Sequence, residues 1–138
     1  MPFPRPIKHY RITGIPPKST NNLYRWLKKR YVKTFSYQFF RMAMEEHLNK
    51  DPKAAGLLPS AAAAWSDKGL YIEVGIIEEF DLDNTLKGII DSLQAYYRFN
   101  DNQIKGLICR KVPVGNFSLE KTEWDKQYIE IALLQYHN

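Results

Sequence analysis

Apolar residues in the first third of the chain recur first with a strand period and then with a helix period. Residues 1–7 are rich in proline and predict an extended tail, and residues 8–13 alternate as a half-buried strand does. Two prolines and a run of turn formers predict a loop over residues 14–22. From Thr34 a helix is predicted to run to about Asn49, with its buried face formed by Phe35, Phe39, Met42 and Ala43.

The rest of the chain continues this alternation between strand and helix patterns. Residues 69–79 predict a strand, and residues 83–97 predict a helix whose apolar stripe is Leu86, Ile89, Ile90 and Leu93. Two further strands are predicted over residues 104–114 and 123–135. Residues 53–68 fit either a short helix or a mobile flap.

The predicted order of elements, β-α-β-α-β-β, indicates an α/β or α+β fold with a mixed sheet and two main helices. The chain has 138 residues, the size of one domain, and it shows no internal repeat. Residues 1–138 are therefore expected to form a single domain, with residues 1–7 as its extended tail.

Charge is distributed unevenly between the two parts of the chain. Residues 1–50 contain eleven Lys and Arg and two acidic residues, whereas residues 51–138 contain nine Lys and Arg and thirteen acidic residues. A basic segment beside an acidic one fits a protein that binds a polyanion and also builds a cation site. Many small domains are basic for other reasons, so charge alone leaves nucleic acid and other partners open.

Composition also argues against several classes of protein. No apolar run approaches the roughly 20 residues that span a bilayer, and the N-terminus lacks the apolar core of a signal peptide. We therefore expect a cytoplasmic protein without a membrane partner. The single Cys109 lies in an apolar run and is interpreted as an inert core thiol, and no Cys and His spacing suggests zinc.

Candidate chemistry is concentrated where the second predicted helix begins. Asp81 and Asp83 lie at a strand-to-helix junction, where residues two apart point to the same side of an extended chain. Two such carboxylates repel each other unless a cation lies between them, and carboxylate oxygens suit Mg²⁺. Lys87 and Asp91 follow at intervals of four and share one helix face with Asp83. The alternative is that Asp83 only caps a helix whose solvated face carries these charges.

A second segment interleaves aromatic residues with cations over residues 24–41. Lys and Arg would neutralise DNA phosphates, and aromatic rings could stack on unpaired bases. The alternative is that Phe35 and Phe39 belong to the core and the charges form a solvated rim, and for the two phenylalanines this alternative is favoured. The cations predicted to contact DNA are Arg25, Lys28, Lys29, Arg30 and Lys33.

Two families resemble the acidic segment. The string Phe-Asp-Leu-Asp-Asn-Thr-Leu, residues 80–86, is similar to the first motif of haloacid-dehalogenase-type phosphatases. That resemblance covers seven residues, and the chain is too short after Asp83 for the rest of that family's doubly wound body.

A wider pattern resembles the RusA-type Holliday junction resolvases. It reads Asp-x-Asp-Asn-x-x-Lys-x-x-x-Asp-x-Leu from Asp81, followed by Asp-x-Gln-Ile from Asp101. The N-terminal loop of that family is matched by Pro16, Pro17, Asn21, Asn22 and Tyr24, and the resemblance spans about residues 10–115. Residues 51–68 match nothing in the pattern, and the family often has an acidic pair where this chain has Asn100-Asp101.

This second resemblance implies a DNA endonuclease of recombination and repair that uses Mg²⁺, or Mn²⁺ in its place. It implies that Asp81, Asp83 and Asp101 are metal ligands and that Lys87 is an essential lysine. It further implies that Asn84 orients the site, that Asp91 has a supporting role, and that Asn22 belongs to the DNA-binding loop. A homodimer making two symmetric nicks in a four-way junction is implied by the family and its substrate. The remaining alternatives are a branched-DNA-binding protein without catalysis and the phosphatase.

The reach of Asp101 depends on the helix that precedes it. A helix from Asp83 to about Ala95 is roughly 18 Å long, and the five or six residues that follow span at most about 20 Å. Asp101 therefore reaches Asp81 and Asp83 of its own chain only if this stretch doubles back or the helix ends early. Otherwise the third ligand comes from a partner subunit.

Overall fold

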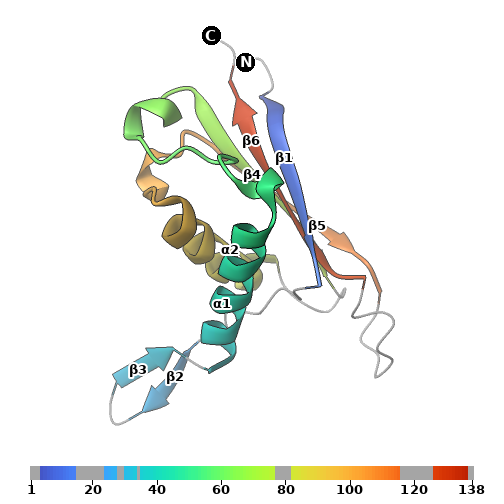
Figure 1. The fold of residues 1–138 in the computed structure, drawn as a ribbon. Coiled ribbons are helices and arrows are strands. Elements are labelled where there is room, and N and C mark those ends of the chain that lie inside the picture. The colour runs from blue at the N-terminus through green and yellow to red at the C-terminus, as the bar shows by residue number, and fades with distance from the viewer. Residues whose placement is uncertain are drawn as a thin grey trace.

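A four-stranded sheet and two helices form the body of the molecule in a computed structural model, which describes residues 4–14, 24–27, 30–33, 35–76, 82–115 and 126–136. The sheet has the strand order β1 (Arg5–Thr13), β6 (Tyr128–Gln135), β4 (Lys68–Ile76) and β5 (Leu107–Pro113) (Figure 1). Strand β6 runs antiparallel to both of its neighbours, whereas β4 and β5 are parallel. The mixed sheet and the α+β class predicted from the sequence are confirmed.

Helices α1 (Phe35–Lys50) and α2 (Leu82–Tyr97) lie on one face of the sheet (Figure 1). Helix α2 connects the parallel strands β4 and β5, which need such a crossover. Its predicted stripe packs on the core: Ile89 and Leu93 are fully buried, and Leu86 and Ile90 are partly buried. The amphipathic pattern therefore predicted both this helix and its buried face.

The predicted buried face of α1 is wrong. Phe39 and Met42 are 54% and 64% exposed, and the core instead receives Phe40, Met44 and Leu48. These three residues also recur every four positions, so they form a second apolar stripe shifted by one residue from the predicted one. Packing against the sheet and α2 selects between the two stripes. The side chain of Phe35 lies outside the described residues.

The N-terminal segment contains more strand than the sequence predicted. Strand β1 begins at Arg5, so residues 5–7 belong to the sheet and not to a tail: Arg5 and Pro6 pair with β6, and Ile7 lies at a β-bulge. Strands β2 (Tyr24–Leu27) and β3 (Arg30–Lys33) form an antiparallel hairpin before α1, where no strand was predicted. The hairpin projects from the helix end of the molecule (Figure 1). Most of the predicted loop, residues 15–23, lies outside the described residues.

The segment 51–68 is an integral part of the core. It contains two short 3₁₀ helices, η2 (Pro52–Ala54) and η3 (Ala62–Trp65), and buries four apolar residues, Ala54, Leu57, Leu58 and Trp65. The indole of Trp65 donates to the Pro59 carbonyl at 2.8 Å, and its ring packs on Phe99 with centroids 5.1 Å apart. The Tyr97 hydroxyl donates to the Ala54 carbonyl at 2.6 Å. The segment therefore holds the C-terminal end of α2, and the alternative of a mobile flap is not supported.

Cys109 occupies an outer strand, so its assignment to the core is wrong. It lies on β5, the last strand of the sheet, and is partly buried. That burial raises the pKa of its thiol. Among the described helices, none is long and apolar enough to cross a membrane.

Candidate functional site

The N-terminal end of α2 carries the acidic segment singled out from the sequence. Helix α2 begins at Leu82, one residue earlier than predicted, so Asp83 lies in its first turn. The side chain of Asp83 is exposed. The Thr85 hydroxyl donates to the Leu82 carbonyl at 2.7 Å within this turn. Asp81 and the side chain of Asn84 lie outside the described residues. An exposed carboxylate at this position is accessible to a cation and to a large substrate.

Lys87 is held beside the acidic segment by an ion pair one turn further along α2. Its ammonium lies 3.5 Å from a carboxylate oxygen of Asp91, and the two side chains are 48% and 26% exposed. Lys87 follows Asp83 by four residues, so the two share a face of the helix. The ion pair restrains the lysine while leaving half of its surface open to solvent.

Asp101 lies at the opposite end of α2 from Asp83. The helix does not end early, because it continues to Tyr97, and Asp101 then begins the 3₁₀ turn η4 (Asp101–Gln103). Because β4 and β5 are parallel, a turn that precedes β5 lies where β4 begins, whereas Asp83 follows the end of β4. A helix of 16 residues separates them, a length of about 24 Å. The structure therefore does not bring Asp101 to Asp83 within one chain.

The acidic segment offers the oxygen ligands that a divalent metal requires. Asp83 supplies an exposed carboxylate, which fits Mg²⁺ with most of its waters retained. Within the described residues, which omit Asp81, no three His, Cys, Asp or Glu side chains gather into a metal site. The donor chemistry of the segment thus fits a divalent cation, and completion of the site needs residues beyond Asp83.

The predicted DNA-binding cations fall on and beside the β2–β3 hairpin. Arg25 lies in β2, and Arg30 and Lys33 lie in β3, with Arg25 opposite Val32 and Lys33 opposite Tyr24. Lys28, Lys29 and Asn22 lie outside the described residues, as do the side chains of the hairpin. A two-stranded ribbon with five cations in nine residues has dimensions that suit a DNA groove.

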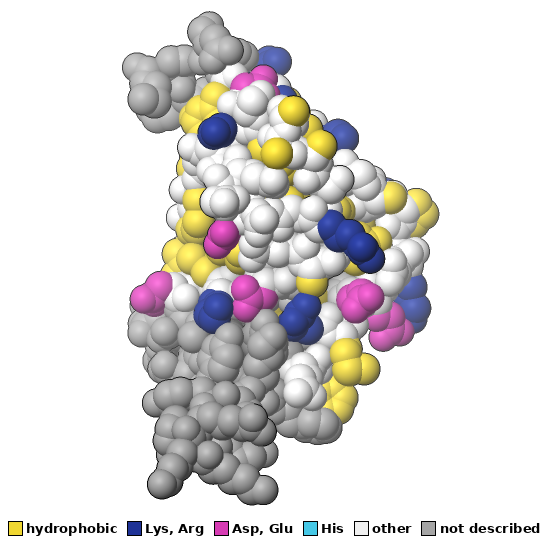
Figure 2. All heavy atoms as spheres, turned by 90° about the vertical axis from the view of Figure 1, so that its left-hand side faces the viewer, with side chains coloured by type: hydrophobic (Ala, Val, Ile, Leu, Met, Phe, Trp, Pro, Cys, Tyr) yellow, Lys and Arg dark blue, Asp and Glu magenta, His cyan; other side chains and the backbone are white. Residues whose placement is uncertain are grey.

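The described part of the helix-covered side carries charges of both signs. Figure 2 shows acidic and basic side chains next to one another in a band across this side of the molecule. Local charges of opposite sign largely cancel at distances beyond the Debye length. Among the described residues, this face does not form a continuous cationic surface.

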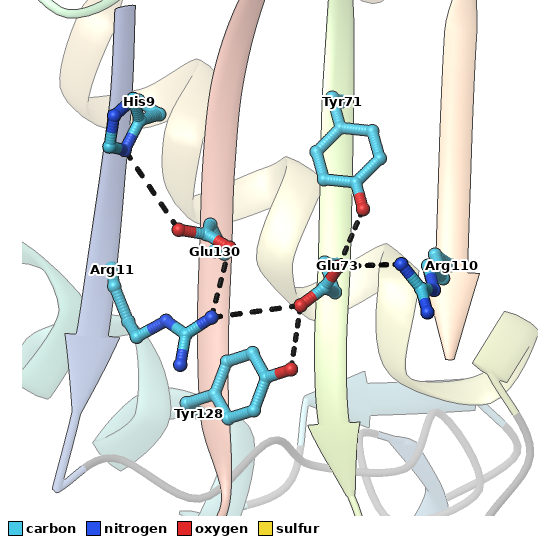
Figure 3. A network of polar contacts seen from close by, with 7 residues as sticks. All are labelled: His9, Arg11, Tyr71, Glu73, Arg110, Tyr128 and Glu130. Atoms are coloured by element: carbon cyan, nitrogen blue, oxygen red, sulfur yellow. Dashed lines mark hydrogen bonds and ion pairs between the residues drawn. The ribbon is translucent and has the colours of Figure 1, made fainter. Parts of the chain in front are cut away.

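A polar network on the other face of the sheet was not predicted from the sequence. Glu73 of β4, only 8% exposed, accepts hydrogen bonds of 2.6 Å from the hydroxyls of both Tyr71 and Tyr128 (Figure 3). Arg11 and Arg110 lie 3.8 and 3.7 Å from its two oxygens. Tyr71 lies two residues from Glu73 on β4, whereas Arg11, Arg110 and Tyr128 are far away in sequence and only strand register brings them to Glu73.

The network sets the protonation of its members. Burial alone would raise the pKa of Glu73, but the hydrogen bonds from Tyr128 and Tyr71 and the two arginines outweigh it, so the net pKa lies below the ordinary 4.5. Burial, followed by the bond to Glu73, raises the pKa of Tyr128 to about 12. The carboxylate is therefore charged and the hydroxyls are protonated at neutral pH. The network ties β4 to its neighbours β6 and β5 and also to β1, the strand beyond β6.

A pH dependence of stability follows from the lowered pKa of Glu73. A depressed folded-state pKa stabilises the fold above the unfolded value, and this contribution is lost as pH falls through the folded value. The free energy of unfolding should therefore drop below about pH 4.5, and the drop should be smaller in Glu73→Gln. Urea unfolding at neutral pH and at about pH 3 measures it. Glu45→Gln on the exposed face of α1 is the matched control, and equal drops in the two variants would contradict the assignment.

The sheet topology decides against the phosphatase resemblance. That family requires a doubly wound parallel sheet with helices on both faces. Here the described sheet contains a single parallel pair, β4 and β5, and both main helices lie on the same face (Figure 1). The seven-residue likeness at residues 80–86 is therefore local.

A comparison with known protein families matches residues 14–120 to a family model described as endodeoxyribonuclease RusA. The match covers the hairpin, both helices, β4, β5 and all the acidic residues considered above. A comparison with curated proteins gave no match. Because the family match spans most of the chain, the protein belongs to the RusA endodeoxyribonucleases and is a DNA endonuclease of the Holliday-junction type.

Proposed function

We propose that this endonuclease cuts four-way DNA junctions in recombination and repair, using a Mg²⁺ site built on Asp81 and Asp83. The observation that carries the proposal is the exposed Asp83 at the start of α2, with Lys87 on the same helix face, inside the matched region. Asp81 precedes Asp83 by two residues in the sequence and is proposed as the second carboxylate of the site. Members of the family generally depend on a divalent metal.

Each residue of the segment has a distinct part in this proposal. Asp81 and Asp83 would hold Mg²⁺, or Mn²⁺ in its place, and the cation supplies positive charge that offsets the charge developing on the phosphate. Lys87 binds a non-bridging oxygen of the scissile phosphate. The positive end of the α2 dipole also attracts that phosphate. Asp91 holds Lys87 by their 3.5 Å ion pair and has no contact with the substrate, and Asn84 orients the turn.

A homodimer fits this chemistry and its substrate. A four-way junction has nearly two-fold symmetry, so two identical sites related by a two-fold axis would make two symmetric nicks. The distance between Asp83 and Asp101 along α2 adds a second reason for a dimer. If Asp101 is a metal ligand, the carboxylate that completes each site comes from the other subunit.

The β2–β3 hairpin and its turn are proposed as the main electrostatic contact with DNA. Each phosphate neutralised steepens the plot of log affinity against log salt by about 0.9 for duplex DNA. Changing Lys28, Lys29 and Arg30 together to Ala should flatten that slope by roughly two to three. Binding titrations over a series of salt concentrations on junction and linear duplex should show the same change for both, because phosphate contacts carry no sequence information.

Cleavage at saturating concentrations of the triple variant should survive, because none of the three residues belongs to the acidic segment. A triple variant at Arg98, Lys105 and Arg110, cations between the end of α2 and β5, is the matched comparison. If that second variant flattens the slope and the first does not, the DNA-binding surface lies in the segment from the end of α2 to β5 and not on the hairpin.

Incubation with a synthetic four-way junction and with a linear duplex of the same sequence, in Mg²⁺ and in EDTA, tests the proposed function. We expect nicks in the junction and not in the duplex, and only when Mg²⁺ is present. Junction binding without nicks would indicate a branched-DNA-binding protein. Release of phosphate from a small phosphomonoester with intact DNA would contradict the endonuclease proposal.

A further inference from the structure

Two large apolar side chains are exposed together on the N-terminal half of α1. Phe39 is 54% exposed and Met42 is 64% exposed, and residues three apart are neighbours on a helix surface. At about 100° of rotation per residue, Met42 points away from the buried Phe40 and Met44. The pair therefore forms an apolar surface that folding of the chain does not bury.

This apolar pair lies on the same side of the molecule as the proposed active site. Both helices cover one face of the sheet, so their outward surfaces adjoin (Figure 1). They meet at a small hollow lined by Arg41, Glu45, Ser92, Ala95 and Tyr96. Lys87 is half exposed and off the apolar stripe of α2, so it also points away from the sheet. Packed helices lie about 8–10 Å apart, less than the width of a DNA major groove, about 12 Å. DNA in contact with Lys87 therefore reaches α1 as well.

The charges around the pair favour DNA as the molecule that covers it. Helix α1 begins directly after the β2–β3 hairpin and its cations. Arg41 is the only charged residue among residues 35–44, and the acidic residues Glu45 and Glu46 follow only beyond Met42. Glu46 is paired with Lys50 at 2.6 Å, which offsets its charge. A polyanion that binds the hairpin therefore reaches Phe39 and Met42 without first passing a carboxylate of α1.

We propose that Phe39 and Met42 form an apolar wedge that inserts between bases at the branch point and gives the enzyme its preference for junctions. Apolar side chains do not bind phosphate, and the apolar part of DNA is the faces of its bases, which are stacked on one another in a duplex. Phe and Met are among the residues that insert between base steps. Unstacking is least costly where pairing is already interrupted. The wedge therefore enters a branch point more readily than a continuous duplex.

The wedge and the hairpin contribute differently to binding. The hairpin neutralises phosphates, which every DNA carries, so it strengthens binding to junction and duplex alike. The wedge strengthens binding to the junction alone, and discrimination is the difference between the two affinities. This inference rests on the proposed function only in placing the scissile phosphate at Lys87.

A double variant, Phe39→Ala with Met42→Ala, tests the wedge by binding in EDTA, where no cleavage occurs. Junction affinity should fall by roughly 10- to 100-fold, the range expected for loss of stacking on one or two bases. Duplex affinity and the salt dependence of binding should not change, because no phosphate contact is lost. Ile7→Ala is the control, since Ile7 is 41% exposed but lies on the edge strand β1, and it should change neither affinity.

A fluorescent base at the branch point reports the unstacking itself. 2-Aminopurine, which brightens when it is unstacked, should brighten when the unaltered protein binds the junction and stay dim with saturating double variant. A second variant, Phe39→Leu with Met42→Leu, keeps the apolar bulk and should restore brightening. A junction with mismatched bases at its branch point is already unstacked, so it should recover most of the affinity that the alanine variant loses. Both positions are exposed, so melting temperature should be unchanged in all variants.

The results that overturn the wedge differ from those that overturn the proposed function. An unchanged ratio of junction to duplex affinity in the alanine variant, or equal brightening with it, would overturn the wedge even if cleavage is normal. A change in the assembly state of the DNA-free variant by sedimentation would show that a second copy covers the pair, and would overturn it too. Conversely, if the unaltered protein binds and unstacks the junction but does not cut it in Mg²⁺, the wedge stands and the proposed function is contradicted.

Discussion

Asp83→Asn is expected to abolish junction cleavage while junction binding is retained or strengthened. The variant loses a proposed metal ligand, and metal ions contribute several kcal/mol of transition-state stabilisation. At ~1.4 kcal/mol for each factor of ten, the rate should fall by about a thousandfold. Binding should not fall, because removing a negative charge lowers repulsion of DNA phosphate. Single-turnover cleavage in Mg²⁺ and a binding titration in EDTA measure the two quantities separately.

Two further variants serve as comparisons for the loss of cleavage in Asp83→Asn. Lys87→Ala should also lose cleavage without a change in melting temperature, because Lys87 is half exposed and lies off the apolar stripe of α2. Glu46→Gln, an exposed residue of α1 paired with Lys50, should keep full activity. Near-normal cutting by Asp83→Asn would refute the metal assignment. A large drop in the melting temperature of Lys87→Ala would mark that residue as structural.

Trp65→Ala is expected to be the most destabilising single substitution in the segment 51–68. Truncating a buried aromatic residue to alanine costs about 3–5 kcal/mol, and Trp65 is fully buried against Phe99. Small domains are stable by only about 5–15 kcal/mol, so a large part of the total would be lost. Urea unfolding followed by circular dichroism measures the change.

A conservative variant separates the two contributions of Trp65. Trp65→Phe keeps a buried aromatic ring but loses part of the indole's packing and the 2.8 Å hydrogen bond to the Pro59 carbonyl. It should cost less than half as much as Trp65→Ala. Should both variants unfold at the same urea concentration as the unaltered protein, the segment would be a flap lying on the surface and not part of the core.

Sequence periodicity predicted the elements whose pattern is unambiguous. Helix α2 has one apolar stripe, and its face followed directly from Ile89 and Leu93. Helix α1 has two stripes shifted by one residue, because Phe39 and Phe40 are adjacent, and local sequence cannot choose between them. The β2–β3 hairpin lacks the Gly or Asn turn residues that usually mark a hairpin, since Lys28 and Lys29 join its strands.

The sequence predicts which candidate site residues lie together only where those residues are close in the chain. Asp83, Lys87 and Asp91 follow one another at intervals of four on α2, and the Lys87–Asp91 ion pair agrees with that spacing. The position of Asp101 depends on β4 and β5 being parallel, which no local pattern specifies. The same holds for Glu73, whose four partners come from four different strands. Strand register creates such clusters, and it becomes visible only in the folded chain.

Cleavage of a supercoiled plasmid that extrudes a cruciform tests the central claim most directly. A dimer with two Asp81–Asp83 sites should make both nicks within the lifetime of one complex, so linear DNA should form directly in Mg²⁺ and not in EDTA. The Asp81→Asn protein should leave the plasmid supercoiled. Relaxed circles with a single nick, or cleavage that persists in EDTA or in Asp81→Asn, would contradict a metal-dependent dimeric resolvase.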